Sequence, residues 1–93
     1  MARPGSAPAM ASLGYTLMLK GEDKAAIDLF HQAIEVDPKY APAHYNLAFA
    51  LSNIKETNVA AREYAKAHEL DPSLTAPKEL KVKPKSRSLS ITP

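Results

Sequence analysis

The chain has few side chains whose types and spacing could bind a metal. Its three histidines are His31, His44 and His68, and no two of them are four residues apart, as ligands on one helix face would be. No acidic cluster joins them at the spacing that a zinc site requires. We therefore expect no metal site, and we expect His44 to pack with its polar edge toward solvent.

The arrangements that nucleophilic or phosphate chemistry needs are also missing. The sequence contains no cysteine, which excludes a thiol nucleophile, a disulfide framework and cysteine-based zinc sites. It has no glycine-rich phosphate loop, nucleophile elbow or isolated carboxylate pair. Asp37 and Asp71 each precede a proline, a position where aspartate forms turns. We predict that the chain is not an enzyme and needs no cofactor.

Charge is unevenly distributed along the 93 residues. Residues 1–74 carry seven Lys or Arg and nine acids, a net charge of −2, whereas residues 75–93 carry five and one, a net charge of +4. The basic end has no aromatic residue to stack on bases. We expect a basic disordered tail over 84–93, and the less favoured alternatives are that this tail contacts nucleic acid, an anionic membrane or an acidic partner.

The N-terminal stretch lacks the apolar core of a signal peptide, and no run approaches the roughly 20 apolar residues of a membrane span. We therefore expect a flexible N-terminus over residues 1–6, no membrane span and a cytoplasmic location.

An internal repeat of 34 residues organises the rest of the chain. A shift by this length places Ala7-Pro8-Ala9 on Ala41-Pro42-Ala43, and Asp37-Pro38 on Asp71-Pro72. It also aligns Leu13 with Leu47, Leu17 with Leu51, Ala26 with Ala60, Phe30 with Tyr64, Ala33 with Ala67 and Glu35 with Glu69. Repeats of this length are built from one supersecondary unit each, and stacking the units buries a shared core.

Each repeat has the pattern of two helices joined by a turn. Apolar residues at i, i+3, i+4 and i+7 predict helices over about 8–20 and 42–54, followed by helices that end near Val36 and Leu70. Met10, Leu13, Gly14 and Leu17 form the apolar stripe of the first helix. Small residues, among them Gly14 and Ala26, permit close helix crossings. The fold is therefore expected to be all-α, with two stacked helix-turn-helix units.

The turns inside the two units differ in sequence. Gly21 ends the first helix of the first unit, and Asp23 is the expected N-cap of the next helix. In the second unit Lys55 replaces the glycine and Thr57 is the expected N-cap. This replacement predicts a longer or looser turn.

This pattern resembles the tetratricopeptide repeat family, whose 34-residue unit reads W-x₂-L-G-x₂-Y, then A-x₃-F, A and P. The first unit gives Met10-x₂-Leu13-Gly14-x₂-Leu17, Ala26-x₃-Phe30, Ala33 and Pro38, and the second gives His44-x₂-Leu47-Ala48-x₂-Leu51, Ala60-x₃-Tyr64, Ala67 and Pro72. The resemblance implies units at 7–40 and 41–74. A third unit fails because Lys81 stands where leucine is required, so residues 75–83 are expected to form a short capping helix.

The resemblance also implies a concave groove lined by the first helix of each unit. The groove positions are Ala11, Ser12, Tyr15, Met18, Leu19, Tyr45, Asn46, Phe49, Ser52 and Asn53. Several of these residues are apolar yet lie off the stripe of the first helices, which is typical of an interface. The alternative is that neighbouring helices or a terminus of the same chain cover them.

The groove positions carry aromatic and amide side chains but no lysine or arginine, which favours a neutral or apolar partner segment. Subfamilies that clamp acidic chaperone tails use a cluster of Lys, Arg and Asn. Asn46 matches one such position, but Ala11 and Tyr15 do not match theirs. We predict a protein-interaction module that binds a peptide or partner segment. The alternatives are a self-associating structural unit, that is a homo-oligomer, or a fragment of a longer array.

Overall fold

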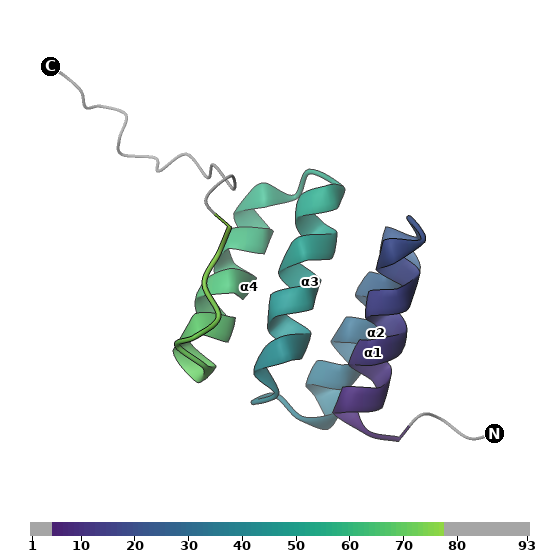
Figure 1. Ribbon diagram of the computed structural model, residues 1–93, viewed down its shortest axis with the longest axis horizontal. Coiled ribbons are helices and arrows are strands. Elements are labelled where there is room, and N and C mark those ends of the chain that lie inside the picture. Colours follow the sequence, from purple (N-terminus) through teal and green to yellow (C-terminus); the bar gives the residue numbers. More distant parts are fainter. Residues whose placement is uncertain (1–4, 78–93) are drawn as a thin grey trace, which may run out of the picture.

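The computed structural model describes residues 5–77, which form four helices in chain order. These are α1 (Ala7–Leu19), α2 (Asp23–Val36), α3 (Ala41–Asn53) and α4 (Thr57–Leu70). No strand occurs within this described range, so the all-α prediction is confirmed. Figure 1 shows the helix pairs α1–α2 and α3–α4 standing side by side. No helix in the described part of the chain is long and apolar enough to cross a membrane.

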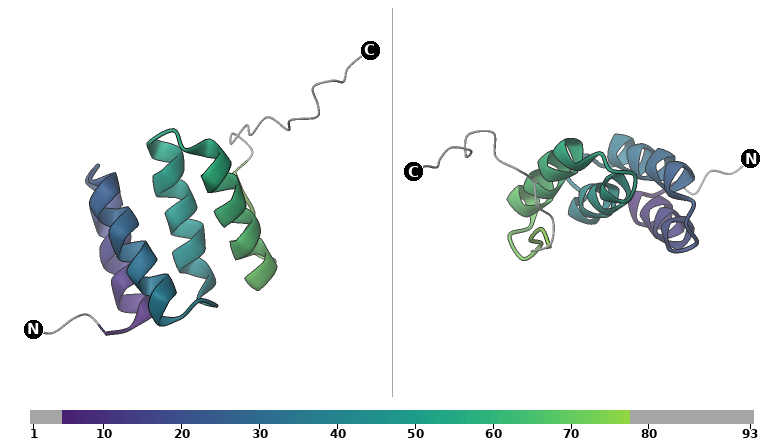
Figure 2. Two further views of the ribbon diagram at one scale, coloured as in Figure 1. Left: turned by 180° about the vertical axis from the view of Figure 1, so that it is seen from behind. Right: turned by 90° about the horizontal axis from the view of Figure 1, so that it is seen from above.

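The helices form two layers. Seen from above in Figure 2, α1 and α3 lie in one layer and α2 and α4 in the other. Helix α3 is central, because it packs against α1, α2 and α4, whereas α1 packs only against α2 and α3 among the described elements. Helix α1 is therefore at one end of the array, with one side facing no described element.

Residues 71–77 follow α4 and turn back along it on the side of the α1–α3 layer (Figures 1 and 2). Residues 74–77 have no regular secondary structure, so the expected capping helix is not formed over 75–77. The remainder of that expected helix, and the tail predicted for 84–93, lie outside the described residues, as do residues 1–4.

The helix starts differ from the predicted caps. Ser6 caps α1, since its hydroxyl accepts a hydrogen bond from the Ala9 backbone N–H at 3.1 Å. The N-caps of α2 and α4 are Glu22 and Glu56, and neither side chain makes a capping hydrogen bond. The assignment of Asp23 and Thr57 as caps was therefore wrong by one residue, because both already lie within the helix.

The prediction of a longer or looser turn at Lys55 was also wrong. The N–H of Gly21 donates to the Met18 carbonyl at 2.9 Å, and the N–H of Lys55 donates to the Ser52 carbonyl at 3.0 Å. These two acceptors are equivalent positions of the repeat. Gly21 has a φ of 88° and Lys55 a φ of 70°, so lysine adopts the left-handed conformation that glycine takes in the first unit. The turn geometry is kept at the cost of backbone strain.

Small residues bring the helices of each pair together. Ala26, Ala33, Ala60 and Ala67 are fully buried. A Cβ built on Gly14 would lie only 2.6 Å from Cε1 of the buried Phe30 ring, so this ring packs directly on the backbone of α1. A side chain at position 14 would displace the ring and separate α1 from α2.

The predicted apolar stripe of α1 is only partly buried. Leu13 is 46% exposed, whereas its counterpart Leu47 is fully buried. The reason is position in the array, because the face of α3 that carries Leu47 packs against the first unit, and the same face of α1 meets no described element. Leu13 therefore belongs to the apolar stripe but not to the buried core.

His44 is buried, not edge-out as predicted, with 6% of its surface exposed. Its Nδ1 lies 2.8 Å from Glu63 Oε1 on α4, and its Nε2 lies 2.9 Å from the Pro38 carbonyl oxygen in the loop before α3. Both ring nitrogens thus face oxygen acceptors. The ring ties α3 to α4 and to the connection between the units, which is a structural role.

Candidate functional site

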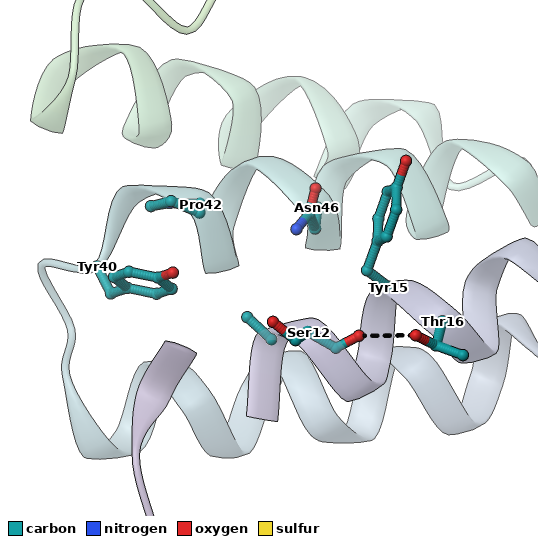
Figure 3. A pocket seen from close by; sticks show the side chains of 7 residues that line it. Ser12, Tyr15, Thr16, Tyr40, Pro42 and Asn46 are labelled. Atoms are coloured by element: carbon teal, nitrogen blue, oxygen red, sulfur yellow. Dashed lines mark hydrogen bonds between the residues drawn. The ribbon is translucent and has the colours of Figure 1, made fainter. Parts of the chain in front are cut away.

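A hollow of about 390 Å³ lies between α1 and α3, at the surface where the groove was predicted. Its lining comes from α1, from the start of α3 and from the connection that precedes it. The lining residues are Ala11, Ser12, Tyr15, Thr16, Tyr40, Pro42 and Asn46. Figure 3 shows Tyr40 and Tyr15 at opposite ends of the hollow, with Asn46 between them on the α3 side. Four predicted groove residues, Ala11, Ser12, Tyr15 and Asn46, are brought together here.

The hollow offers hydrogen-bonding groups but no charge. None of its lining residues is acidic or basic. The Thr16 hydroxyl donates to the Ser12 backbone carbonyl at 3.2 Å and is engaged within the helix. The hydroxyls of tyrosine and serine can donate or accept, and the amide of Asn46 can do both at once. Such a lining suits a neutral polar ligand such as a peptide backbone.

The two repeats differ at a position that lines the hollow. Ala11 occupies in α1 the place that Tyr45 occupies in α3. The Tyr45 ring packs edge-on against Phe49 and Tyr64, with centroid distances of 5.2 and 5.5 Å. The first unit has no aromatic side chain at position 11. In the second unit, the ring at the equivalent position belongs to a cluster of three aromatic rings, Tyr45, Phe49 and Tyr64.

The second half of the predicted groove is partly covered by the chain itself. The Tyr45 hydroxyl donates to the backbone carbonyl of Thr75 at 2.8 Å. His68 Nδ1 lies 3.0 Å from the Leu74 carbonyl oxygen, which accepts its proton. An extended stretch of backbone is thus held against α3 and α4 by two side chains. This is the coverage by a terminus that the sequence left open.

The turn that starts this stretch is closed by Asp71. Its carboxylate accepts hydrogen bonds from the Ser73 hydroxyl at 2.8 Å and from the Ser73 backbone N–H at 3.1 Å. The hydroxyl, then the N–H, lower the pKa of this exposed carboxyl from its ordinary value of 3.8, because both stabilise the ionised form. Asp37 closes the equivalent turn between the units through the Lys39 N–H at 3.1 Å.

The remaining predicted groove residues lie outside the hollow. Met18, Phe49 and Ser52 are half-buried, and Leu19 is 68% exposed. The Asn53 amide donates to the Asp23 carboxylate at 2.9 Å, so it joins α3 to the start of α2. Their part in binding stays a prediction.

Sequence reasoning missed three lining residues, Thr16, Tyr40 and Pro42. The signal for Tyr40 and Pro42 was their place in the proline-bounded connection between the units, which brings them beside α1. Among residues 5–77 no three His, Asp or Glu side chains gather into a group that could hold a metal ion.

Comparison with known families agrees with this arrangement. The family described as "TPR repeat" matches residues 14–54, and the one described as "Tetratricopeptide repeat" matches residues 41–74. Together these matches span well over half of the chain. The chain belongs to the tetratricopeptide repeat family. The predicted resemblance is confirmed, and such repeats indicate a protein–protein interaction module.

Two curated plant proteins are similar to this tetratricopeptide chain, and both are named "Probable UDP-N-acetylglucosamine--peptide N-acetylglucosaminyltransferase SPINDLY". The protein from Hordeum vulgare is 40% identical over 58 residues, and the one from Oryza sativa subsp. japonica is 38% identical over 58 residues. The matched segment is 62% of this chain but only 6% of the length of either relative.

Proposed function

We propose that this module binds an extended, uncharged peptide segment of a partner protein in the hollow between α1 and α3. The observation that carries the proposal is the lining of the hollow. Two tyrosines at its ends and Asn46 between them supply apolar surface and hydrogen-bonding groups without charge. An extended backbone has unpaired N–H and C=O groups that Asn46 and the hydroxyls can satisfy.

The contact of the chain with its own residues 74–77 supports this choice of ligand. There, a tyrosine hydroxyl on α3 donates to a backbone carbonyl of a segment without regular structure. Tyr15 and Tyr40 offer hydroxyls of the same kind around the hollow. A partner segment in the hollow would repeat, one unit earlier, the type of contact that the chain makes with itself.

We further propose that the module binds without catalysing. The lining of the hollow provides hydroxyls, an amide and aliphatic groups, but no histidine or carboxylate to act as a general base. The two plant relatives are named as transferases that act on peptide, but the likeness covers 6% of their length. Their names support a peptide as the class of ligand. Because the match is so short, they do not support transferase activity in this chain.

The test is selection of binding peptides from a random library displayed on phage, with the whole chain as bait. Wild type should enrich peptides that share a common sequence segment, and this segment should carry no charged residue. A Tyr15→Ala/Asn46→Ala variant should fail to retain them, because it removes one end of the hollow and its central amide. Enrichment of strongly acidic or basic peptides, or equal retention by the variant, would contradict the proposal.

The repeat itself supplies a second variant that fills the hollow without removing a lining group. Ala11→Tyr introduces the side chain that the second unit carries as Tyr45. Its ring would lie between Tyr15 and Phe30, the counterparts of Phe49 and Tyr64. This variant should keep its helical circular dichroism and lose the selected peptides. A matched control is Ala25→Tyr, at an exposed position of α2, which should bind as wild type does.

A further inference from the structure

Helix α1 presents an uncharged surface to solvent. No acidic or basic residue occurs between Ala7 and Leu19. Among the described residues, the exposed large hydrophobic side chains are Leu13, Tyr15, Leu19 and Val36, and three of these four lie on α1. A helix at the end of a soluble array normally turns a charged face to water. This one does not, and an exposed apolar surface of this kind is typical of a contact surface.

The equivalent face of α3 in the second unit is covered. Ala43 and Leu47 of α3 are fully buried and Leu51 is 8% exposed, because this face packs against the first unit. The equivalent residues of α1 are Ala9, which is exposed, Leu13, which is 46% exposed, and Leu17, which is half-buried. We call Ala9, Leu13 and Leu17 the α1 end face.

The opposite end of the array does not complement the α1 end face. Helix α4 carries Arg62, Lys66, His68 and Glu69 at exposed positions. Residues 71–77 are also held against this end through His68 and Tyr45. A head-to-tail stack of two copies would desolvate these charges against an uncharged helix, which is unfavourable. Two α1 end faces carry no charge within the helix and match one another.

We propose that the α1 end face binds the α1 end face of a second copy, forming a twofold dimer with the two α1 helices antiparallel. A twofold contact uses the same patch on both subunits, and an apolar, uncharged patch is self-complementary. Leu13 is the central residue of α1, so an antiparallel pair centred on the helix brings the two Leu13 side chains together. The antiparallel arrangement also places the two Lys20 residues, which follow α1, at opposite ends of the contact.

This contact is distinct from the proposed peptide site. Leu13 does not line the hollow, and the hollow is formed by α1 together with α3 of the same chain. The proposed dimer does not use the residues of the peptide site. The two proposals can therefore be tested separately, and either can fail without the other.

The absence of cysteine allows a direct cross-linking test. Leu13→Cys should form a disulfide-linked dimer under mild oxidation at least about tenfold faster than Val36→Cys, since a shared interface raises the local thiol concentration. Val36 is a matched control, because it is 50% exposed and lies outside the α1 end face. Equal rates for the two variants would overturn the proposal. So would faster disulfide formation between Leu13→Cys and Ala65→Cys in a mixture, which would indicate head-to-tail stacking.

Sedimentation of the whole chain gives the second readout. Wild type should shift from monomer to dimer as its concentration rises through tens of micromolar. Leu13→Glu should remain monomeric with unchanged helical circular dichroism, because Leu13 supports little of the monomer core. A wild type that stays monomeric over this range, or a Leu13→Glu variant that still dimerises, would contradict the inference.

Discussion

Lys55 has a φ of 70° at the position where the first unit has Gly21, and this places a single strained residue in the turn of the second unit. The backbone hydrogen bonds of the two turns are the same, so the strain is local. Left-handed backbone costs a residue with a Cβ about 1–2 kcal/mol, partly offset by the smaller entropy loss of such a residue on folding.

Lys55→Gly should therefore raise the free energy of unfolding by about 0.5–1 kcal/mol. The measurement is urea denaturation followed by circular dichroism. Gly21→Lys is the reverse exchange, and it should lower stability by a similar amount. A Cβ at Gly21 would meet no atom within 4 Å. The loss of stability in Gly21→Lys would therefore come from backbone strain and not from a steric clash. Lower stability of Lys55→Gly would show that the lysine side chain contributes more than the strain costs.

Asp71 is the other residue whose local contacts have a measurable consequence. Because its pKa is lowered in the folded chain, its contribution to stability is present above the ordinary value of 3.8 and is lost as pH falls through the folded pKa. The titration of the Asp71 carboxyl by NMR should have its midpoint below 3.8. Ser73→Ala should move this midpoint upward, since the hydroxyl is the largest cause of the shift. A midpoint unchanged by Ser73→Ala would contradict this assignment.

At the scale of the helices, equivalent leucines have different roles because α1 ends the array and α3 is central. Leu47→Ala should lower the free energy of unfolding by about 3 kcal/mol, as is usual for a buried leucine. Leu13→Ala should change it by no more than about 0.5 kcal/mol, as for an exposed side chain. Denaturation at low micromolar concentration, where the monomer prevails, makes the comparison. Similar losses at both positions would show that Leu13 is covered in the monomer.

The positions of the helices could be predicted from the sequence, because the apolar spacing and the prolines of the connection between the units are local features of the chain. The ends of α1 and α3 fell within one residue of the expected 8–20 and 42–54. The exposure of Leu13 could not be predicted in this way, because the two units share the same apolar spacing. The spacing does not reveal that α3 has a neighbouring helix on each side whereas α1 lacks one on one side among the described elements. The Lys55 turn was missed because the surrounding hydrogen bonds override the preference of the residue.

At the scale of the whole molecule, the two units are alike in fold and unlike in what they expose. Ala11 of the first unit lines the hollow between the units, whereas its counterpart Tyr45 packs on Phe49 and donates to the Thr75 carbonyl. The sequence predicted four of the seven lining residues, since family geometry places the first helices on the groove. It did not predict the contribution of Thr16, Tyr40 and Pro42, because this depends on how the connection between the units lies beside α1.

We therefore propose a different role for each of these surfaces. The hollow is the proposed peptide site and the α1 end face is the proposed contact between copies. The α4 end stays polar, and residues 74 and 75 contact it through His68 and Tyr45. The proposed peptide site is the central claim.

The most direct test of that claim is an NMR titration of the whole chain with a neutral peptide obtained by the selection described above. The largest chemical-shift changes should occur at Ser12, Tyr15 and Asn46, and Ala11→Tyr should abolish them. Changes confined to α2, α4 or the residues after Pro77, with the hollow unaffected, would contradict the account.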